Sequence, residues 1–218
     1  METLNFLVNP LNNWVYAPPS HVQPLSESLG AWNRVYGIYY YVPTIRGSPY
    51  TRPRRVRLVR FPLQPRITSN SLQRFLNGVS YFAFLGSFCK RHRIDVLINE
   101  DIFSVAALDF LPKNVLRIFD FSDYFPDSAM IYVRHKPLKP LIRAGTWNLT
   151  LRNIRASHMC LSPSQRLLAL ARRYGCEDTF FFPNSVETDY YRFSSKKRAC
   201  MRRHLGFREN DFVLAHSG

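Results

Sequence analysis

Short apolar runs alternate with helix-like patterns along the 218 residues of this chain. The apolar runs suit β-strands and cover residues 4–8, 35–42, 94–98, 115–119 and 179–182. Between them, apolar residues recur every three or four positions, as they do in amphipathic helices, over residues 72–83, 138–154 and 164–173. Strands that alternate with helices are typical of βαβ units. The pattern therefore predicts an α/β fold, a Rossmann-like parallel sheet with helices on both faces.

Some details of the pattern place individual elements. Residues 56–61 alternate apolar side chains with arginines, which predicts a strand near an edge of the sheet. Residues 179–182 are expected to form a buried strand. Trp32 continues the helical spacing of the first helix and is expected on its apolar side. No helix is expected between the strand at 115–119 and the helix at 138–154.

The composition changes after Tyr191. Residues 1–192 are expected to form one complete Rossmann-like domain. Residues 194–206 predict a short basic helix closed by a glycine, and residues 211–216 predict a strand with nothing after it to pair with. We therefore expect residues 193–218 to be an interdomain linker helix and the first strand of a second domain that the chain lacks.

Thirty Lys and Arg residues against fifteen Asp and Glu give a formal net charge of +15. Such an excess favours phosphate-bearing partners or anionic membrane surfaces. Between Glu27 and Asp95 there is no acidic residue, and arginines accumulate there beside an aromatic helical segment. We predict a membrane-binding or phosphate-binding patch in this stretch, made of Arg52, Arg54, Arg55, Arg57, Arg91 and Arg93. The alternative is that these arginines are only solvated while the aromatic helix packs on the sheet.

Other sequence features exclude several classes of protein. The four cysteines form no C-x-x-C pair, so no metal site and no disulfide framework is predicted. The most apolar stretch, residues 75–88, is interrupted by polar residues and is shorter than the ~18 residues of a membrane-spanning helix. No signal peptide is readable at the N-terminus. We expect a cytoplasmic protein, with peripheral contact to the inner face of the membrane as a further option.

Polar residues follow several of the predicted strands: Asn9, Asn99-Glu100-Asp101, Ser122-Asp123, Ser162 and Asn184. The carboxyl ends of parallel strands meet at one edge of a sheet, where ligands collect, so we expect these residues to line one cleft. Glu100 and Asp101 would bind hydroxyl groups or begin the next helix, where acids suit the helix dipole. Asp123 would serve the site or cap the turn before Pro126. Asn184 would fix the interdomain crossover or contact substrate.

Four segments carry a resemblance to a known family. They are residues 115–127 (VLRIFDFSDYFPD), residues 157–162 (SHMCLS), residues 180–187 (FFFPNSVE) with the following YRF, and residues 205–207 with 212–218. In this order they resemble the N-terminal half of family 4 retaining glycosyltransferases, which have the two-domain GT-B architecture. The last segment is similar to the family's linker helix and the first strand of its nucleotide-sugar domain.

This resemblance implies an acceptor-side domain of an enzyme that moves a sugar from a nucleotide-sugar donor to a glycan or lipid-linked acceptor. It implies transfer with retention of configuration and without a metal. It also implies no cofactor, because the nucleotide sugar is a substrate bound mainly by the absent domain. The isolated chain is expected to be inactive. Catalytic roles are implied for Asp123 and for Ser122, which stands where many members have His. Substrate contacts are implied for Asn13, Ser20, His21, Asn99, Glu100, Asp101, Ser162, Asn184 and Glu187.

Two other functions remain open on the sequence. The chain would be a basic nucleic-acid-binding α/β protein if its arginines contacted phosphates and its aromatic residues stacked on bases. No RRM, KH, zinc-finger or helix-turn-helix signature supports that reading. The chain would alternatively be a non-catalytic Rossmann-like module that only binds a partner.

Overall fold

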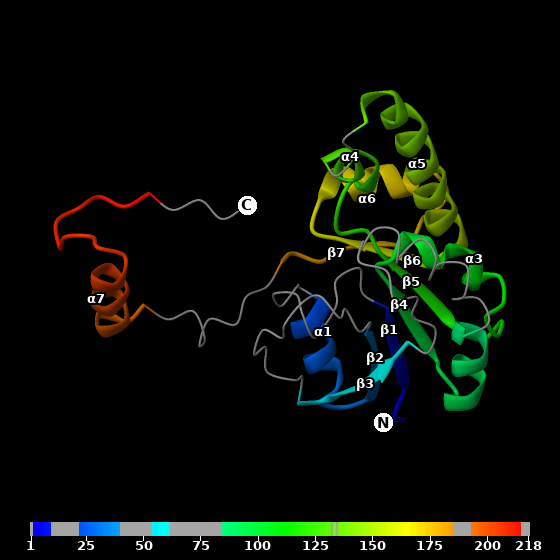
Figure 1. Cartoon of the computed structure of the whole chain (residues 1–218). Coiled ribbons are helices and arrows are strands. Elements are labelled where there is room, and N and C mark those ends of the chain that lie inside the picture. The colour runs from blue at the N-terminus through cyan, green and yellow to red at the C-terminus, as the bar shows by residue number, and fades with distance from the viewer. Residues whose placement is uncertain are drawn as a thin grey trace. The chain divides into compact units, whose positions relative to one another are not determined.

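Figure 1 shows the whole chain, of which the computed structural model describes residues 2–9, 22–39, 54–61, 84–131, 133, 135–184 and 193–214; at 22, 23 and 39 it describes the backbone alone. The chain divides into two compact units, Met1–Ser185 and Val186–Gly218, and each is described by itself. The expected domain boundary after residue 192 stays a prediction.

A parallel sheet forms the centre of the first unit. Its strands are β1 (Asn5–Asn9), β2 (Arg34–Tyr39), β3 (Val56–Arg60), β4 (Val96–Asn99), β5 (Leu116–Asp120), β6 (Met159–Ser162) and β7 (Thr179–Phe181). The strands are hydrogen-bonded in the order β3-β2-β1-β4-β5-β6-β7, with every neighbouring pair parallel. The predicted Rossmann-like parallel sheet is therefore confirmed, as is the edge position of β3.

One face of the sheet is covered by α1 (Val22–Leu29). Successive side chains of a strand point to opposite faces. Phe6 and Val8 of β1 therefore point to the same face, where they pack against Leu25 and Leu29 of α1.

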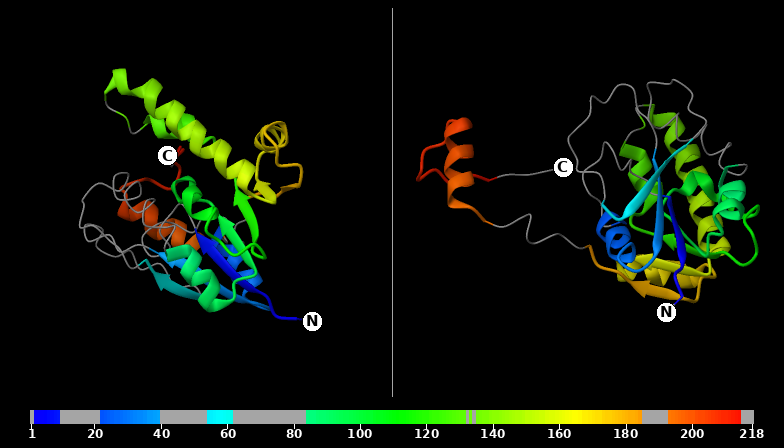
Figure 2. Two further views of the ribbon diagram at one scale, coloured as in Figure 1. Left: turned by 90° about the vertical axis from the view of Figure 1, so that its right-hand side faces the viewer. Right: turned by 90° about the horizontal axis from the view of Figure 1, so that it is seen from below.

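The opposite face carries the remaining helices of the first unit (Figures 1 and 2). Leu7 points to this face and packs with the helix formed by residues 84–92 and with α3 (Val105–Leu108). Further along the same face, Phe119 of β5 packs with Ile154 of α5 (Lys139–Ala156) and Ala171 of α6 (Gln165–Arg173). Helices therefore cover both faces, as predicted.

Three sequence expectations need correction. The helix α4 (Phe125–Ile131) lies where none was expected. Trp32 lies in the turn after α1 and is 75% exposed rather than on a helix. Phe180 and Phe181 of the edge strand β7 point to opposite faces of the sheet and are both exposed, so the expected buried strand is wrong. The long helix expected at 72–83 lies entirely outside the described residues.

The second unit contains α7 (Ser195–His204), the basic helix that the sequence predicts. The Ser194 hydroxyl oxygen accepts the Lys197 N–H at 3.2 Å and caps its start. Gly206 follows the helix with a φ of +75°, a left-handed conformation that favours glycine at a helix end. Residues 211–214 pair with no strand among the described residues, and the expected first strand of a second domain stays a prediction. Among the described residues of the whole chain, every helix is too short or too polar to span a bilayer.

A buried network of side chains lies where the order of the strands reverses. From β1 the chain adds β2 and β3 on one side, whereas β4 to β7 follow on the other. Asn9 of β1 donates from Nδ2 to Asn99 Oδ1 at 2.7 Å and to Ser104 Oγ at 3.2 Å. Asn99 of β4 donates from its own Nδ2 to Asn153 Oδ1 at 3.0 Å. We call Asn9, Asn99, Ser104 and Asn153 the amide network.

The amide network ties two strands to a helix. All four residues are buried, between 0% and 2% exposed, and Asn153 belongs to α5. Asn153 also donates to the carbonyl of Ile102 in η1 (Ile102–Ser104) at 3.0 Å. Buried amides stabilise a fold when their hydrogen bonds are made and destabilise it when a partner is removed. The network therefore fixes how β1, β4 and α5 meet.

We predict that Asn99→Leu lowers the free energy of unfolding by about 2–4 kcal/mol, because it leaves the amides of Asn9 and Asn153 without this partner in the core. Urea denaturation measures the change. The matched control is Thr150→Val, which removes a buried hydroxyl that donates to Thr146 O of its own helix and is expected to change stability by less than about 1 kcal/mol. Equal losses in the two variants would contradict a special role for the network.

A second prediction compares two helical glycines. A Cβ at Gly86 would lie 2.9 Å from the carbonyl oxygen of Phe110, whereas nothing lies within 4 Å of a Cβ at Gly145. We expect Gly145→Ala to stabilise the chain by about 0.5–1 kcal/mol through helix propensity. Gly86→Ala is expected to destabilise it by about 1–3 kcal/mol, because backbone atoms must move. Thermal melts of the two variants test this, and a gain at both positions would contradict the packing at Gly86.

Candidate ligand-binding rim

The carboxyl ends of the strands bring together most of the polar residues that the sequence singles out. We call this edge the rim; it comprises Asn9, residues 99–101, residues 120–123, Ser162 and Asn184. The order of the strands reverses between β1 and β4, and open parallel sheets bind ligands at such a reversal. These residues therefore follow the carboxyl ends of strands in one parallel sheet, while the expectation that they line one cleft and contact substrate stays a prediction.

Two residues at the ends of β4 and β5 make a direct side-chain contact across the rim. Ser122 donates from Oγ to Glu100 Oε1 at 3.0 Å. Glu100 is 3% exposed, and Asp120, the last residue of β5, is 1% exposed. Ser122 itself is half-buried. The rim therefore has buried carboxylates beneath a hydroxyl that remains partly accessible.

Asp101 and Asn99 are engaged inside the protein. Asp101 Oδ1 accepts the Phe103 N–H at 2.9 Å and caps η1, so of the two roles considered for Asp101 the structure shows the start of the next helix. Asn99 uses its side chain in the amide network. Both residues are buried, and the substrate contacts implied for them stay predictions.

Asp123 is exposed and holds the start of α4. Its Oδ1 accepts the Tyr124 N–H at 2.7 Å, and its Oδ2 accepts a hydrogen bond from the Ser128 hydroxyl. The expected capping of the turn before Pro126 is therefore present. A carboxylate oxygen accepts more than one hydrogen bond, so these contacts leave Asp123 able to bind a hydroxyl group as well.

Ser162 and Asn184 complete the described rim. Ser162 is fully buried; its hydroxyl donates to Phe121 O at 2.7 Å and accepts the Ser164 N–H at 3.1 Å. It thereby joins the end of β5 to the start of α6. Asn184 follows β7 and is exposed. The remaining implied contacts, at Asn13, Ser20, His21 and Glu187, lie outside the described residues.

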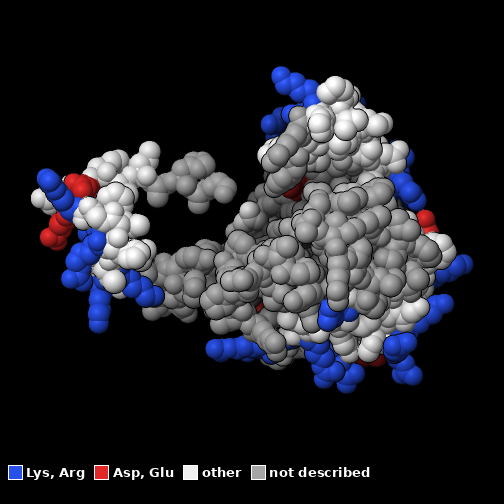
Figure 3. Space-filling model, viewed as in Figure 1, with Lys and Arg blue, Asp and Glu red and all other residues white. Residues whose placement is uncertain are grey.

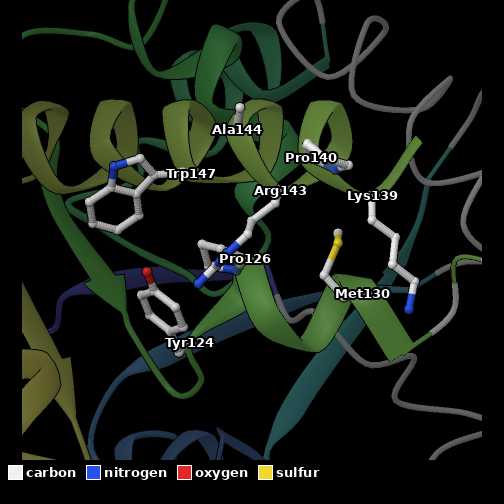
Figure 4. Close-up of a pocket in the computed structure, with 8 residues that line it drawn as sticks. All are labelled: Tyr124, Pro126, Met130, Lys139, Pro140, Arg143, Ala144 and Trp147. Carbon is white, nitrogen blue, oxygen red and sulfur yellow. The ribbon is translucent and has the colours of Figure 1, made fainter. Parts of the chain in front are cut away.

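A groove between α4 and α5 begins at the rim and was not foreseen from the sequence (Figure 4). Its volume is about 620 Å³. Its walls are Tyr124, Pro126 and Met130 on the α4 side and Lys139, Pro140, Arg143, Ala144 and Trp147 on α5. The rings of Tyr124 and Trp147 lie 5.9 Å apart between centroids. The groove could not be predicted from the sequence, because one of its two walls is α4, which was not recognised as a helix.

The predicted basic patch lies at the other edge of the sheet. Arg54, Arg55 and Arg57 are at the start of β3, and Arg91 and Arg93 shortly precede β4; all five are exposed. The side chain of Glu27 accepts the N–H groups of Arg54 and Arg55, at 2.6 and 3.1 Å. Lys and Arg side chains gather along this lower edge in Figure 3. Arg52 lies outside the described residues.

Among the residues that the structure describes, the two edges of the sheet therefore differ in charge. A ligand at the rim meets carboxylates and hydroxyls, whereas a ligand at the opposite edge meets arginines. The five described arginines of the patch therefore lie apart from the described residues of the rim. Among the described residues, no group of three or more His, Cys, Asp or Glu side chains is placed to hold a metal ion.

Comparison with known proteins identifies the fold. No protein-family model matches the sequence, and no curated protein is significantly similar to it. Sucrose-phosphate synthase from Thermosynechococcus elongatus has the same fold, with a TM-score of 0.67 and 12% identity over 95% of this chain and 53% of the synthase chain. A second structure of that synthase gives a TM-score of 0.53 and 10% identity, over 94% of this chain and 99% of the other. The chain spans about half the length of the first synthase chain and has a GT-B glycosyltransferase-like fold.

Proposed function

We propose that this chain is the acceptor-side domain of a glycosyltransferase, which moves a sugar from a nucleotide-sugar donor to a hydroxyl-bearing acceptor. The observation that carries the proposal is the likeness in fold to sucrose-phosphate synthase over 95% of the chain. The rim adds support, because it lies at the reversal of strand order, where open parallel sheets bind their ligands.

The charge of the described rim residues favours an acceptor over a nucleotide diphosphate. Asp123 places an exposed carboxylate just after β5, while the carboxylates of Glu100 and Asp120 at the ends of β4 and β5 are buried. Carboxylates accept strong hydrogen bonds from sugar hydroxyls. Phosphates instead bind best to arginines, lysines and helix N-termini. The donor diphosphate would therefore bind to a different part of the whole enzyme, and this domain would hold the acceptor.

Within this proposal, Asp123 orients the acceptor hydroxyl that is glycosylated. Ser122, which is held by its hydrogen bond to Glu100, contacts the same acceptor. Both residues are accessible enough to reach a ligand, since Asp123 is exposed and Ser122 is half-buried. The resemblance of residues 115–127 to family 4 enzymes supports transfer with retention of configuration and without a metal. The nucleotide sugar is then a substrate, and no cofactor takes part.

We predict that the 218-residue chain binds at least one member of a panel of mono- and disaccharides saturably, as measured by saturation-transfer NMR. Asp123→Asn should raise the dissociation constant about tenfold, because it replaces a charge-assisted hydrogen bond by a weaker neutral one. The matched control is Ser128→Ala, which removes the structural partner of Asp123 and keeps its carboxylate. This control should stay within about twofold of the wild type.

Two results would count against the proposed role. If Ser128→Ala weakens binding as much as Asp123→Asn, the carboxylate only supports α4. If no sugar of the panel binds while nucleic acid binds with a steep dependence on salt concentration, the acceptor-domain proposal fails in favour of nucleic-acid binding.

A further inference from the structure

Three exposed aliphatic side chains lie close together in the sequence, between the end of α4 and the first turn of α5. Ile131 is 80% exposed at the end of α4, Leu138 is 46% exposed in η2 (Lys136–Leu138), and Leu141 is 71% exposed in the first turn of α5. We call residues 131, 133 and 135–141, the described part of this segment, the α4–α5 tip. The first half of α5 projects beyond the sheet, so the tip lies at one extremity of the first unit (Figures 1 and 2).

The groove enlarges the apolar surface next to the tip. Met130, Pro140 and Ala144 line it between α4 and α5 (Figure 4). Single exposed apolar residues are ordinary, whereas a contiguous apolar area with basic residues around it marks an interaction site.

The charge around the tip is entirely of one sign beyond Asp127. The sequence holds no Asp or Glu from Ser128 to Cys176. Lys136 lies two residues before Leu138 and Lys139 directly after it, and Lys139 also lines the groove. The nearest acid, Asp127, forms an ion pair with Arg143 at 3.0 Å. The apolar residues of the tip are therefore interspersed with lysines and lack carboxylates.

Lysines among exposed aliphatic residues suit a lipid surface better than a protein partner. The centres of protein interfaces are depleted in lysine. At a bilayer, by contrast, the aliphatic side chains enter the acyl boundary while lysine ammonium groups reach up to anionic headgroups. We propose that the α4–α5 tip docks onto an anionic lipid bilayer.

This docking goes beyond the proposed transfer reaction and does not depend on it. It also assigns membrane contact to a different surface from the arginine patch, which lies at the opposite edge of the sheet. Tyr124 is two residues beyond Ser122 and lines the groove, so docking through the tip brings the rim, and not the arginine patch, towards the bilayer.

Vesicle flotation of the 218-residue chain tests the proposal, with phosphatidylcholine vesicles that contain about one-third phosphatidylglycerol. Leu141→Ser should weaken partitioning about tenfold through lost acyl-boundary contact. Trp32→Ser, which removes an equally exposed apolar side chain elsewhere, should leave it within about twofold. A second pair of variants tests the contribution of charge. The double variant Lys136→Gln/Lys139→Gln should weaken vesicle binding at least threefold more than its control, Lys196→Gln/Lys197→Gln in α7, which removes the same charge.

A site-specific probe separates insertion from adsorption by overall charge. In a Cys200→Ser background, which removes the exposed cysteine, an environment-sensitive fluorophore is attached after Leu141→Cys or, as the control, after Trp32→Cys. The other cysteines are buried, and burial raises the pKa of the Cys89 thiol to about 12, which slows its labelling. The label at position 141 should shift to the blue on the anionic vesicles, and the label at 32 should not.

Three outcomes would overturn the proposal: absence of vesicle binding, equal losses within each matched pair, or an unshifted label at position 141. If Leu141→Ser instead dissociates a dimer in solution, the tip is an interface between two copies of this chain, and membrane docking is likewise excluded.

Discussion

The rest of the structure depends on the satisfaction of buried amides where the strand order reverses. Asn9 and Asn99 end adjacent parallel strands, and their side chains bond to each other and to α5 inside the core. An amide without partners there would destabilise the fold, so β1, β4 and α5 have one favourable arrangement. This constraint fixes the position of the end of β4. It thereby also positions Glu100, the next residue, and the rim around it.

The same constraint divides the polar residues of the rim into two groups. Asn99, Asp101 and Ser162 use their side chains to hold strand ends, helix starts and loops together. Ser122 and Asp123 make structural contacts too, but they remain accessible. A ligand at the rim therefore meets a few accessible groups supported by a rigid buried layer, which is the arrangement that precise positioning of a substrate requires.

Much of the fold could be predicted from the sequence because strand ends and helix ends carry local signals. Gly175 and Gly206 both adopt the positive φ expected after a helix, and the strands fall close to the apolar runs. The helix α4 was missed because Pro126 follows a strand and suggests a turn, although a proline is equally suited to the first turn of a helix. Burial of β7 was overestimated, since an apolar run does not reveal whether a strand has one neighbour or two.

The sequence predicts where the candidate site lies better than it predicts what each of its side chains does. Parallel strands place the residues after them at one edge, which a sequence shows directly. Whether an asparagine there binds a ligand or another asparagine depends on contacts between residues distant in the chain, such as Asn99 with Asn153. Sequence spacing does not contain that information. The groove between α4 and α5 was missed because α4 was not recognised as a helix.

The central claim is that the rim binds the sugar acceptor. An amide-resolved NMR titration of the isotope-labelled chain with mono- and disaccharides tests it most directly. The account predicts saturable shifts concentrated at residues 120–124, with little change at residues 54–57 and 91–95. Shifts concentrated at those latter segments, at the arginine-rich edge of the sheet, would contradict it.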